Sequence, residues 1–232
     1  MEIAGRTVLI TGANRGIGRA LVDEALSRGA ERVYAGTRKS FEHPDPRVTP
    51  LSLDVTNPAE IQEAVERIDA LDVLINNAGI ALSDDLSDRG VLEKHIAVNL
   101  FGPFDVAQAF LPLLARSRGA LVNISSLAAL APLPIVPAYS ISKAATFSLT
   151  QSLRTRWAGQ GVSVHAVLLG PVDTDMSKGF EVPKATPKAA AKGILDGVEN
   201  GEEDIFPDPM SASLAEGWRS GVAKGLERQF AA

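Results

Sequence analysis

The alternation of short aliphatic runs with longer amphipathic stretches constrains the fold of this chain more than any other feature. Six aliphatic runs predict buried strands: Thr7–Ile10, Val33–Ala35, Val48–Leu53, Val73–Ile75, Ala120–Ile124 and Val162–Leu169. Five stretches have helical spacing: Ile17–Arg28, Ala59–Ile68, Leu92–Ala115, Tyr139–Ala158 and Pro187–Glu199. A seventh, short strand is expected at Asp204–Phe206. The pattern predicts an α/β fold, a doubly wound parallel sheet with helices on both faces.

The 232 residues fit one domain, so we expect residues 1–232 to form a single unit. Residues 176–190 are rich in Lys, Pro and Gly and predict a short flap beside the substrate. Near the C-terminus, apolar residues recur at every fourth position from 214 to 230. We expect one helix there, with Gly217, Gly221 and Gly225 allowing close backbone packing on the domain or on another subunit.

Composition excludes several classes of protein. The chain has no cysteine, which excludes disulfides, thiolate zinc sites and cysteine nucleophiles and fits a cytoplasmic protein. A formal net charge of -5 disfavours a nucleic-acid partner. The uncharged stretch from Gly119 to Ser142 contains Asn123 and three prolines, so no membrane span is expected. The three histidines are scattered, and we expect no metal site.

A glycine-rich turn follows the first predicted strand and opens the first predicted helix. Gly12 permits a tight turn, Gly16 lets the backbone approach a pyrophosphate, and Gly18 lets the helix pack on the sheet. Helix amides at this point favour phosphate groups. The turn therefore predicts a dinucleotide site, whose contacts include the intervening residues Asn14, Arg15 and Ile17.

The second predicted strand ends in Thr37-Arg38, without the acidic residue that would bind a ribose 2′-hydroxyl. Arg15 and Arg38 instead fit a 2′-phosphate and predict NADP(H) as cofactor. Asp54, followed by Val55, is expected either to accept a bond from the adenine or to cap the next helix. Three residues after the fourth predicted strand are expected to contact the same cofactor: Asn77, Ala78 and Gly79.

Tyr139 and Lys143 lie four residues apart on one face of a predicted helix. A neighbouring ammonium group would lower the pKa of the tyrosine and make it a usable acid or base. Ser126 lies 13 residues before Tyr139, at a strand end, and would donate a hydrogen bond to the same carbonyl oxygen. The neighbouring Ser125 is the rival for this role. Adjacent strand residues face opposite sides of the sheet, and the separation of 13 residues from Tyr139 favours Ser126.

Together these motifs resemble those of the short-chain dehydrogenase/reductases over essentially the whole chain. The resemblance implies a seven-stranded Rossmann fold and a homodimer or homotetramer assembled through the helices after the fourth and fifth strands. It implies that Tyr139 donates the proton, that Lys143 lowers its pKa and binds the ribose, that Ser126 orients the carbonyl, and that Asn99 holds a relay water. It further implies nicotinamide contacts at Gly170, Val172 and Thr174, although Leu169 replaces the usual proline and loosens that turn.

The sequence thus favours an oxidoreductase that transfers a hydride between NADP(H) and a carbonyl or secondary alcohol. The residues expected to contact the substrate are mostly apolar and suit a hydrophobic ketone or aldehyde: Ser126, Leu127, Leu133, Val136, Met176 and Phe180. Two alternatives remain open. One is a reductase of ketoacyl groups on a carrier protein, which would use Lys178, Lys184 and Lys188; the other is a non-catalytic NADPH-binding sensor.

Overall fold

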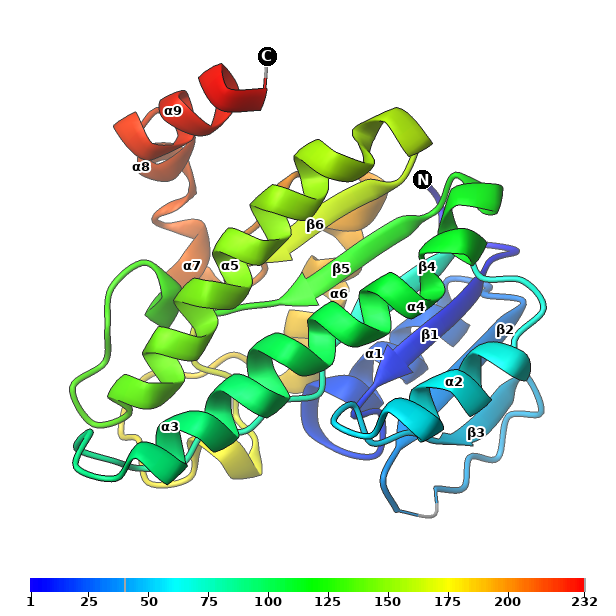
Figure 1. Ribbon diagram of the computed structural model, residues 1–232, viewed down its shortest axis with the longest axis horizontal. Coiled ribbons are helices and arrows are strands. Elements are labelled where there is room, and N and C mark those ends of the chain that lie inside the picture. The colour runs from blue at the N-terminus through cyan, green and yellow to red at the C-terminus, as the bar shows by residue number, and fades with distance from the viewer. Residues whose placement is uncertain (40, 232) are drawn as a thin grey trace.

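A computed structural model describes residues 1–39 and 41–231, and its centre is one parallel sheet of seven strands (Figure 1). The strand order is β3-β2-β1-β4-β5-β6-β7. The strands are β1 (Thr7–Thr11), β2 (Arg32–Thr37), β3 (Val48–Ser52), β4 (Val73–Asn76), β5 (Ala120–Ile124), β6 (Ser163–Val167) and β7 (Asp204–Ile205). The predicted doubly wound sheet is therefore confirmed, with strand ends displaced by one or two residues.

Helices cover both faces of the sheet because the residues of each strand point to the two faces in turn. On β1, Val8 and Ile10 pack into the same core as α1 (Gly16–Ser27) and α6 (Pro187–Glu199). Leu9 points the other way and packs with α2, α4 and α5. The bounds of these three helices are Pro58–Glu66, Gly102–Ser117 and Pro137–Trp157. Both faces are thus buried, which explains why the strands are almost wholly aliphatic.

The chain changes direction across the sheet between β1 and β4. Strands β1, β2 and β3 extend to one side of this point, and β4, β5, β6 and β7 extend to the other. In a parallel sheet such a switch point leaves a crevice at the carboxyl ends of the two central strands, where ligands bind. The glycine turn follows β1, and Asn77 to Gly79 follow β4. The fold therefore gathers the sequence motifs at one edge.

The helix expected at Leu92–Ala115 is longer and irregular. It consists of α3 (Arg89–Ile96), a π-helical turn over Ala97–Phe101, and α4. The Gly102 amide bonds to the Ala97 carbonyl, five residues back. By length and composition the whole run, residues 89–117, could cross a membrane, but Val106, Phe110 and Leu114 are fully buried against the sheet. In this fold it is a core helix.

The C-terminal prediction is wrong in part. Instead of one helix over residues 214–230, the chain forms two, α8 (Ala215–Arg219) and α9 (Val222–Ala231), with a break at Gly221. A separate short helix, α7 (Pro209–Ala212), precedes them. A Cβ atom at Gly217 or Gly225 would meet nothing within 4 Å, so these two glycines provide no close backbone packing on the domain. Helices α8 and α9 project from the body (Figure 1). Lys224 is 3% exposed and lies 2.7 Å from Asp204, which ties α9 to β7.

Candidate active site

The turn between β1 and α1 requires glycine at three positions. Gly12 and Gly16 have φ values of +65° and +53°, a left-handed backbone that favours glycine. Gly18 has no room for a side chain, because a Cβ atom there would lie 2.1 Å from the Gly12 carbonyl oxygen. Asn14 in the same turn is exposed, whereas Ile17 is half-buried and packs against the core. The backbone alone can therefore lie close to a phosphate.

The end of β4 holds this turn in place. Asn77 Nδ2 donates to the carbonyl oxygens of Thr11 and Gly12, at 2.9 Å and 3.2 Å. In return, Thr11 Oγ1 accepts bonds from the Asn77 and Ala78 amides, both at 3.0 Å. A Cβ atom on Gly12 would lie 3.0 Å from Ala78 Cα. The two strand ends thus form one rigid cradle, and Asn77 and Ala78 shape it.

Two arginines project from neighbouring loops at this edge. Arg15 precedes α1, caps none of its amides, and has a side chain that is 70% exposed. Its guanidinium lies 3.4 Å from Asp175. Arg38 is exposed and follows β2, next to the buried Thr37. Because β1 and β2 are adjacent and parallel, both cations lie at the carboxyl edge of the sheet. Two exposed guanidinium groups can bind the additional 2′-phosphate of NADP(H), so the residues present fit this cofactor.

Asp54 organises the turn before α2 but does not cap the helix. The cap is Asn57, whose side chain accepts a bond from the Ala59 amide, so the capping role expected for Asp54 is wrong. The Asp54 Oδ1 atom accepts bonds from the Thr56 amide and hydroxyl, at 2.9 Å and 2.7 Å. Partial burial would raise the pKa of Asp54, but the bonds from Thr56 and the charge of Arg38 hold it below the ordinary value. Val55 is buried in the core, where its side chain packs against Gly102, so the side chain is not available to a ligand.

Ser126, Tyr139 and Lys143 meet at the carboxyl end of β5. Tyr139 and Lys143 lie one turn apart on α5, and Lys143 Nζ is 5.7 Å from the centre of the Tyr139 ring. The Ser126 hydroxyl lies beside the Tyr139 phenol and donates to the Leu169 carbonyl oxygen at 3.4 Å. Lys143 is 6% exposed and donates to the Ile124 carbonyl oxygen at 2.6 Å. A hydroxyl, a phenol and an ammonium group therefore converge beside the glycine-turn cradle.

The two adjacent serines face different surroundings. Ser125 is 2% exposed, and its hydroxyl donates to the Lys143 carbonyl oxygen at 3.2 Å. Ser126 is half-buried, lies beside Tyr139, and accepts a bond from the Ala128 amide at 3.1 Å. The geometry favours Ser126 as the hydroxyl beside a substrate and gives Ser125 a part in fixing α5 to the sheet.

Burial shifts the pKa values of both titratable groups in this trio. It raises the pKa of Tyr139 above its ordinary value of 10.0, and the bond from Ser126 only partly opposes this. It lowers the pKa of Lys143 to about 8. The lowered tyrosine pKa expected from the sequence is thus wrong for the protein without a bound cofactor. The Tyr139 phenol keeps its proton at neutral pH and is available as an acid.

Asn99 lies in the π-helical turn and is 1% exposed. Its side chain binds the backbone of Ile80 on both sides: Nδ2 donates to the carbonyl and Oδ1 accepts from the amide, each at 2.9 Å. Nδ2 also bonds to Ser142 Oγ at 2.9 Å. A Cβ atom on Gly79 would lie 3.2 Å from Asn99 Oδ1 and 3.8 Å from Lys143 Nζ. The small Gly79 therefore leaves Asn99 and Lys143 close together.

The turn after β6 has Leu169 in place of the usual proline, and hydrogen bonds hold it instead. The Leu169 carbonyl accepts a bond from the Leu127 amide at 2.9 Å, and the Gly170 amide donates to Asp208 Oδ2 at 2.8 Å. A Cβ atom on Gly170 would lie 2.5 Å from Asp208. Sequence reasoning missed Asp208. Its signal is the helix-capping pattern with Ser211 three residues later, which the structure contains.

Residues beyond this turn lie across the glycine turn. Val172 is buried, and its carbonyl accepts a bond from Ser177 Oγ at 2.6 Å. The Thr174 methyl group is 3.3 Å from where a Cβ atom on Gly16 would be. The flap expected at residues 176–190 is tied down, since Lys184 Nζ donates to the Ser177 carbonyl at 2.7 Å, and α6 begins at its end.

The face expected to bind the substrate is formed by residues with mostly apolar side chains. Of the residues expected there, Val136 is buried, Ser126, Leu127 and Phe180 are half-buried, and Leu133 and Met176 are each 45% exposed. Leu82 and Ile135 add exposed apolar surface, and the Ser83 hydroxyl donates to the Ile135 carbonyl at 3.5 Å. Within residues 1–39 and 41–231, no three His, Asp or Glu side chains are grouped to hold a metal ion.

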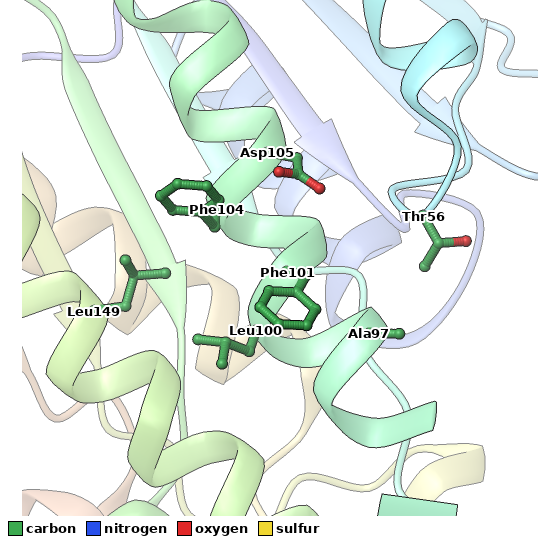
Figure 2. A pocket seen from close by; sticks show the side chains of 7 residues that line it. All are labelled: Thr56, Ala97, Leu100, Phe101, Phe104, Asp105 and Leu149. Carbon is green, nitrogen blue, oxygen red and sulfur yellow. The ribbon is translucent and has the colours of Figure 1, made fainter. Parts of the chain in front are cut away.

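A hollow of about 530 Å³ lies away from the trio, along the outer surface of α4 (Figure 2). Its lining residues are Thr56, Ala97, Leu100, Phe101, Phe104, Asp105 and Leu149. Phe101 and Phe104 are 55% and 38% exposed. The hollow contains none of the residues expected at the catalytic site, so we do not assign the substrate to it.

Comparisons with known proteins agree with this arrangement. The family model described as short chain dehydrogenase matches residues 6–184. A short chain dehydrogenase from Burkholderia cenocepacia, solved in complex with NADP, superposes with a TM-score of 0.90 at 34% identity. That similarity covers 99% of this chain and 98% of the other. A second structure, ElxO with NADP bound, has a TM-score of 0.75 at 28% identity over 83% of this chain and 90% of the other.

Curated relatives include estradiol 17-beta-dehydrogenase 2 of Mus musculus, 32% identical over 76% of this chain. The chain spans about half the length of this relative, 51%. An uncharacterized oxidoreductase of Staphylococcus epidermidis is 32% identical over 85% of this chain and 90% of its own length. The sheet order, the glycine cradle and these matches together establish that the chain belongs to the short-chain dehydrogenase family of oxidoreductases.

Proposed function

We propose that this protein transfers a hydride between NADP(H) and the carbon of a carbonyl or secondary alcohol, with a hydrophobic ketone or aldehyde as substrate. The observation that carries the proposal is the convergence of Ser126, Tyr139 and Lys143 at the sheet edge that also bears the glycine cradle. Phosphate binding and proton transfer would then occur side by side, as hydride transfer to a carbonyl requires.

Each residue of the trio has a chemical role in this proposal. The chemistry that the dinucleotide supplies when bound is a hydride for the carbonyl carbon. Ser126 donates a hydrogen bond to the carbonyl oxygen, and Tyr139 donates a second bond and then its proton, which gives the alcohol. The nearby Lys143 ammonium stabilises the phenolate that remains and binds the ribose. Asn99 holds the Ile80 backbone beside Lys143 and would retain the relay water.

The cofactor is proposed to be NADP(H) because the charges and the free backbone suit it. The glycine turn would hold the pyrophosphate, and Arg15 and Arg38 the 2′-phosphate. Asp54 and the Val55 backbone would face the adenine. Toward the nicotinamide we assign the remaining predicted contacts: Asn77, Ala78, Gly79, Gly170, Val172 and Thr174. The Burkholderia cenocepacia and ElxO structures, each with NADP bound, support this choice.

Exposed apolar side chains support a hydrophobic substrate, and the mouse relative is named for a steroid alcohol. A carrier-protein substrate is less favoured, since two of the three lysines expected to bind it are engaged within the flap. Lys178 pairs with Asp175 at 2.5 Å, and Lys184 bonds to Ser177. We also propose a cytoplasmic homodimer or homotetramer whose subunits meet through α4 and α5, where Phe101 and Phe104 are exposed (Figure 2).

The test is oxidation of NADPH and of NADH against 2-octanone, acetophenone, octanal, estrone and acetoacetyl carrier protein. We expect turnover of the hydrophobic ketones with NADPH preferred. The Tyr139→Phe variant should lose at least about 10³-fold in kcat while it still binds NADPH. Tight NADPH binding without turnover of any compound would support the sensor instead. Turnover of the carrier-protein substrate alone would support the ketoacyl reductase, and equal kcat/KM for the two cofactors would contradict the NADP(H) assignment.

A further inference from the structure

His95 lies on α3, one helical turn before Asn99, and is completely buried. Both of its ring nitrogens have a partner. Nδ1 lies 2.8 Å from the Val91 carbonyl oxygen, and Nε2 lies 3.0 Å from the Leu82 amide nitrogen. The ring also stands edge-on to the Tyr139 ring, with centroids 6.5 Å apart. A histidine that sequence reasoning assigned to no function thus touches both the proposed acid and the loop beside it.

The two partners determine which nitrogen of His95 carries the proton. A carbonyl oxygen only accepts, so Nδ1 must donate to Val91. An amide N–H only donates, so Nε2 must offer its lone pair to Leu82. The ring is therefore neutral with hydrogen on Nδ1, and its acceptor holds the backbone of the loop.

That loop connects His95 to the start of α5. Leu82 is 41% exposed on the substrate side. Two residues later, Asp84 accepts a hydrogen bond from the Ala138 amide at the N-terminus of α5. Both of its carboxylate oxygens lie 3.3 Å from that nitrogen. Ala138 is the residue before Tyr139. A shift of the loop would therefore displace apolar surface at the site and loosen the first turn of the helix that carries the phenol.

We propose that His95 is a positioning residue for the carbonyl substrate: its Nε2 acceptor fixes the Leu82–Asp84 loop, and its ring supports the Tyr139 ring. The inference rests on the proposed function for the identity of the substrate. It does not involve the cofactor cradle, because His95 bonds to Val91 on its own helix and to Leu82 in the substrate loop, and its ring contacts Tyr139 on α5. Loss of the acceptor should weaken substrate binding and leave NADPH binding intact.

Two variants separate the acceptor from the rest of the ring. The side-chain oxygen of His95→Gln reaches the place of Nε2 and keeps the bond to Leu82. The shorter His95→Asn has its amide at the place of Nδ1, so it keeps the Val91 bond and loses Leu82. We expect His95→Asn to raise KM for the panel ketone of highest kcat/KM by about tenfold, the size of one lost hydrogen bond. His95→Gln should remain within about threefold of wild type.

Amide exchange gives a readout that needs no turnover. In His95→Asn the Leu82 amide should exchange at least about tenfold faster, with an unchanged NADPH dissociation constant. His165→Asn is the matched control, since His165 lies on β6, is 3% exposed, and bonds to the Glu202 carbonyl oxygen. It should lower stability without changing KM or Leu82 exchange.

Equal KM values and equal Leu82 exchange in the Asn and Gln variants of His95 would overturn the inference. If no panel compound turns over but Leu82 exchange separates the two variants as expected, the positioning of the loop stands and the proposed function fails.

Discussion

On the cofactor side of the site, backbone atoms set the geometry, whereas on the substrate side exposed side chains do. The cofactor side consists of the glycine turn and the end of β4, where Gly12 and Gly18 are fixed by steric contact and the Asn77 side chain donates to main-chain carbonyl oxygens. The substrate side presents Leu133 and Met176 from loops, each nearly half exposed. A dinucleotide can thus be recognised by shape common to a family, while substrate preference depends on side chains that can change without disturbing the sheet.

The largest effect is expected from one methyl group added on the cofactor side, where it tests whether the backbone of the glycine turn determines cofactor binding. Gly18→Ala places a Cβ atom against the Gly12 carbonyl oxygen, so the turn must move. We expect NADPH affinity to fall by at least about 100-fold and the unfolding free energy by about 3 kcal/mol. Fluorescence titration and chemical denaturation measure the two effects.

Gly217→Ala is the control for that substitution, because a Cβ atom there meets nothing within 4 Å. It should raise the unfolding free energy by about 0.5 to 1 kcal/mol through helix propensity in α8 and leave NADPH binding unchanged. If both glycine variants bind NADPH like wild type, the cradle does not hold the dinucleotide.

On the substrate side, the expected effect is on rate. Ser126→Ala removes the hydroxyl beside Tyr139 and should lower kcat by about 100-fold, with little change in NADPH affinity. Ser125→Ala removes a bond to the Lys143 carbonyl and should mainly lower stability, by about 1 kcal/mol. Steady-state kinetics of the two variants test the assignment, and a larger loss of kcat in Ser125→Ala would reverse it.

Lys143 is proposed to serve both the cofactor and the substrate. Its burial predicts that the unfolding free energy of the protein depends on pH. Its pKa is about 8 in the folded protein and 10.5 in the unfolded chain. Between these values the unfolded chain holds a proton that the folded protein has released, so stability rises as pH rises. Relative to Lys143→Met, wild type should gain about 3 kcal/mol of unfolding free energy between about pH 8 and about pH 10.5. Denaturation curves at both ends of this range measure it, and a constant difference would contradict it.

The smallest effect is expected at the two arginines. Arg38→Ala should reduce the ratio of kcat/KM for NADPH over NADH by about tenfold, because a charge-assisted bond to the 2′-phosphate is lost. Arg15→Ala should do the same more weakly, since Asp175 already pairs with Arg15. Initial rates with both nucleotides measure the ratio, and an unchanged ratio in both variants would place the phosphate elsewhere.

Local patterns carried most of what could be predicted. Strands β1 and β5 were found from their aliphatic runs, and the glycine turn from its spacing, because each depends on neighbours in sequence. The fold class and the gathering of motifs at one edge followed from the same alternation, since parallel strands all end at that edge.

The features that sequence reasoning missed depend on contacts between distant segments. Asp208 reaches Gly170 from another loop, and His95 reaches Leu82 from α3. The direction of the Tyr139 pKa depends on how deeply the folded protein buries the phenol, which no spacing reports. The C-terminal repeat of apolar residues suggested one helix, but the chain breaks at Gly221 into α8 and α9, and the charge of Lys224 anchors α9 to Asp204.

The π-helical turn at Ala97–Phe101 acts as a phase shift within one long helix. Each residue of a regular helix turns the chain by about 100°, so one extra residue rotates α3 relative to α4 by that angle. Phe110 can therefore face the sheet while His95 and Asn99 face the site. A deletion of Leu100 that restored regular winding would keep the core face of α4 and turn both polar side chains away. The extra residue thus gives one helix two independent faces, one for stability and one for chemistry.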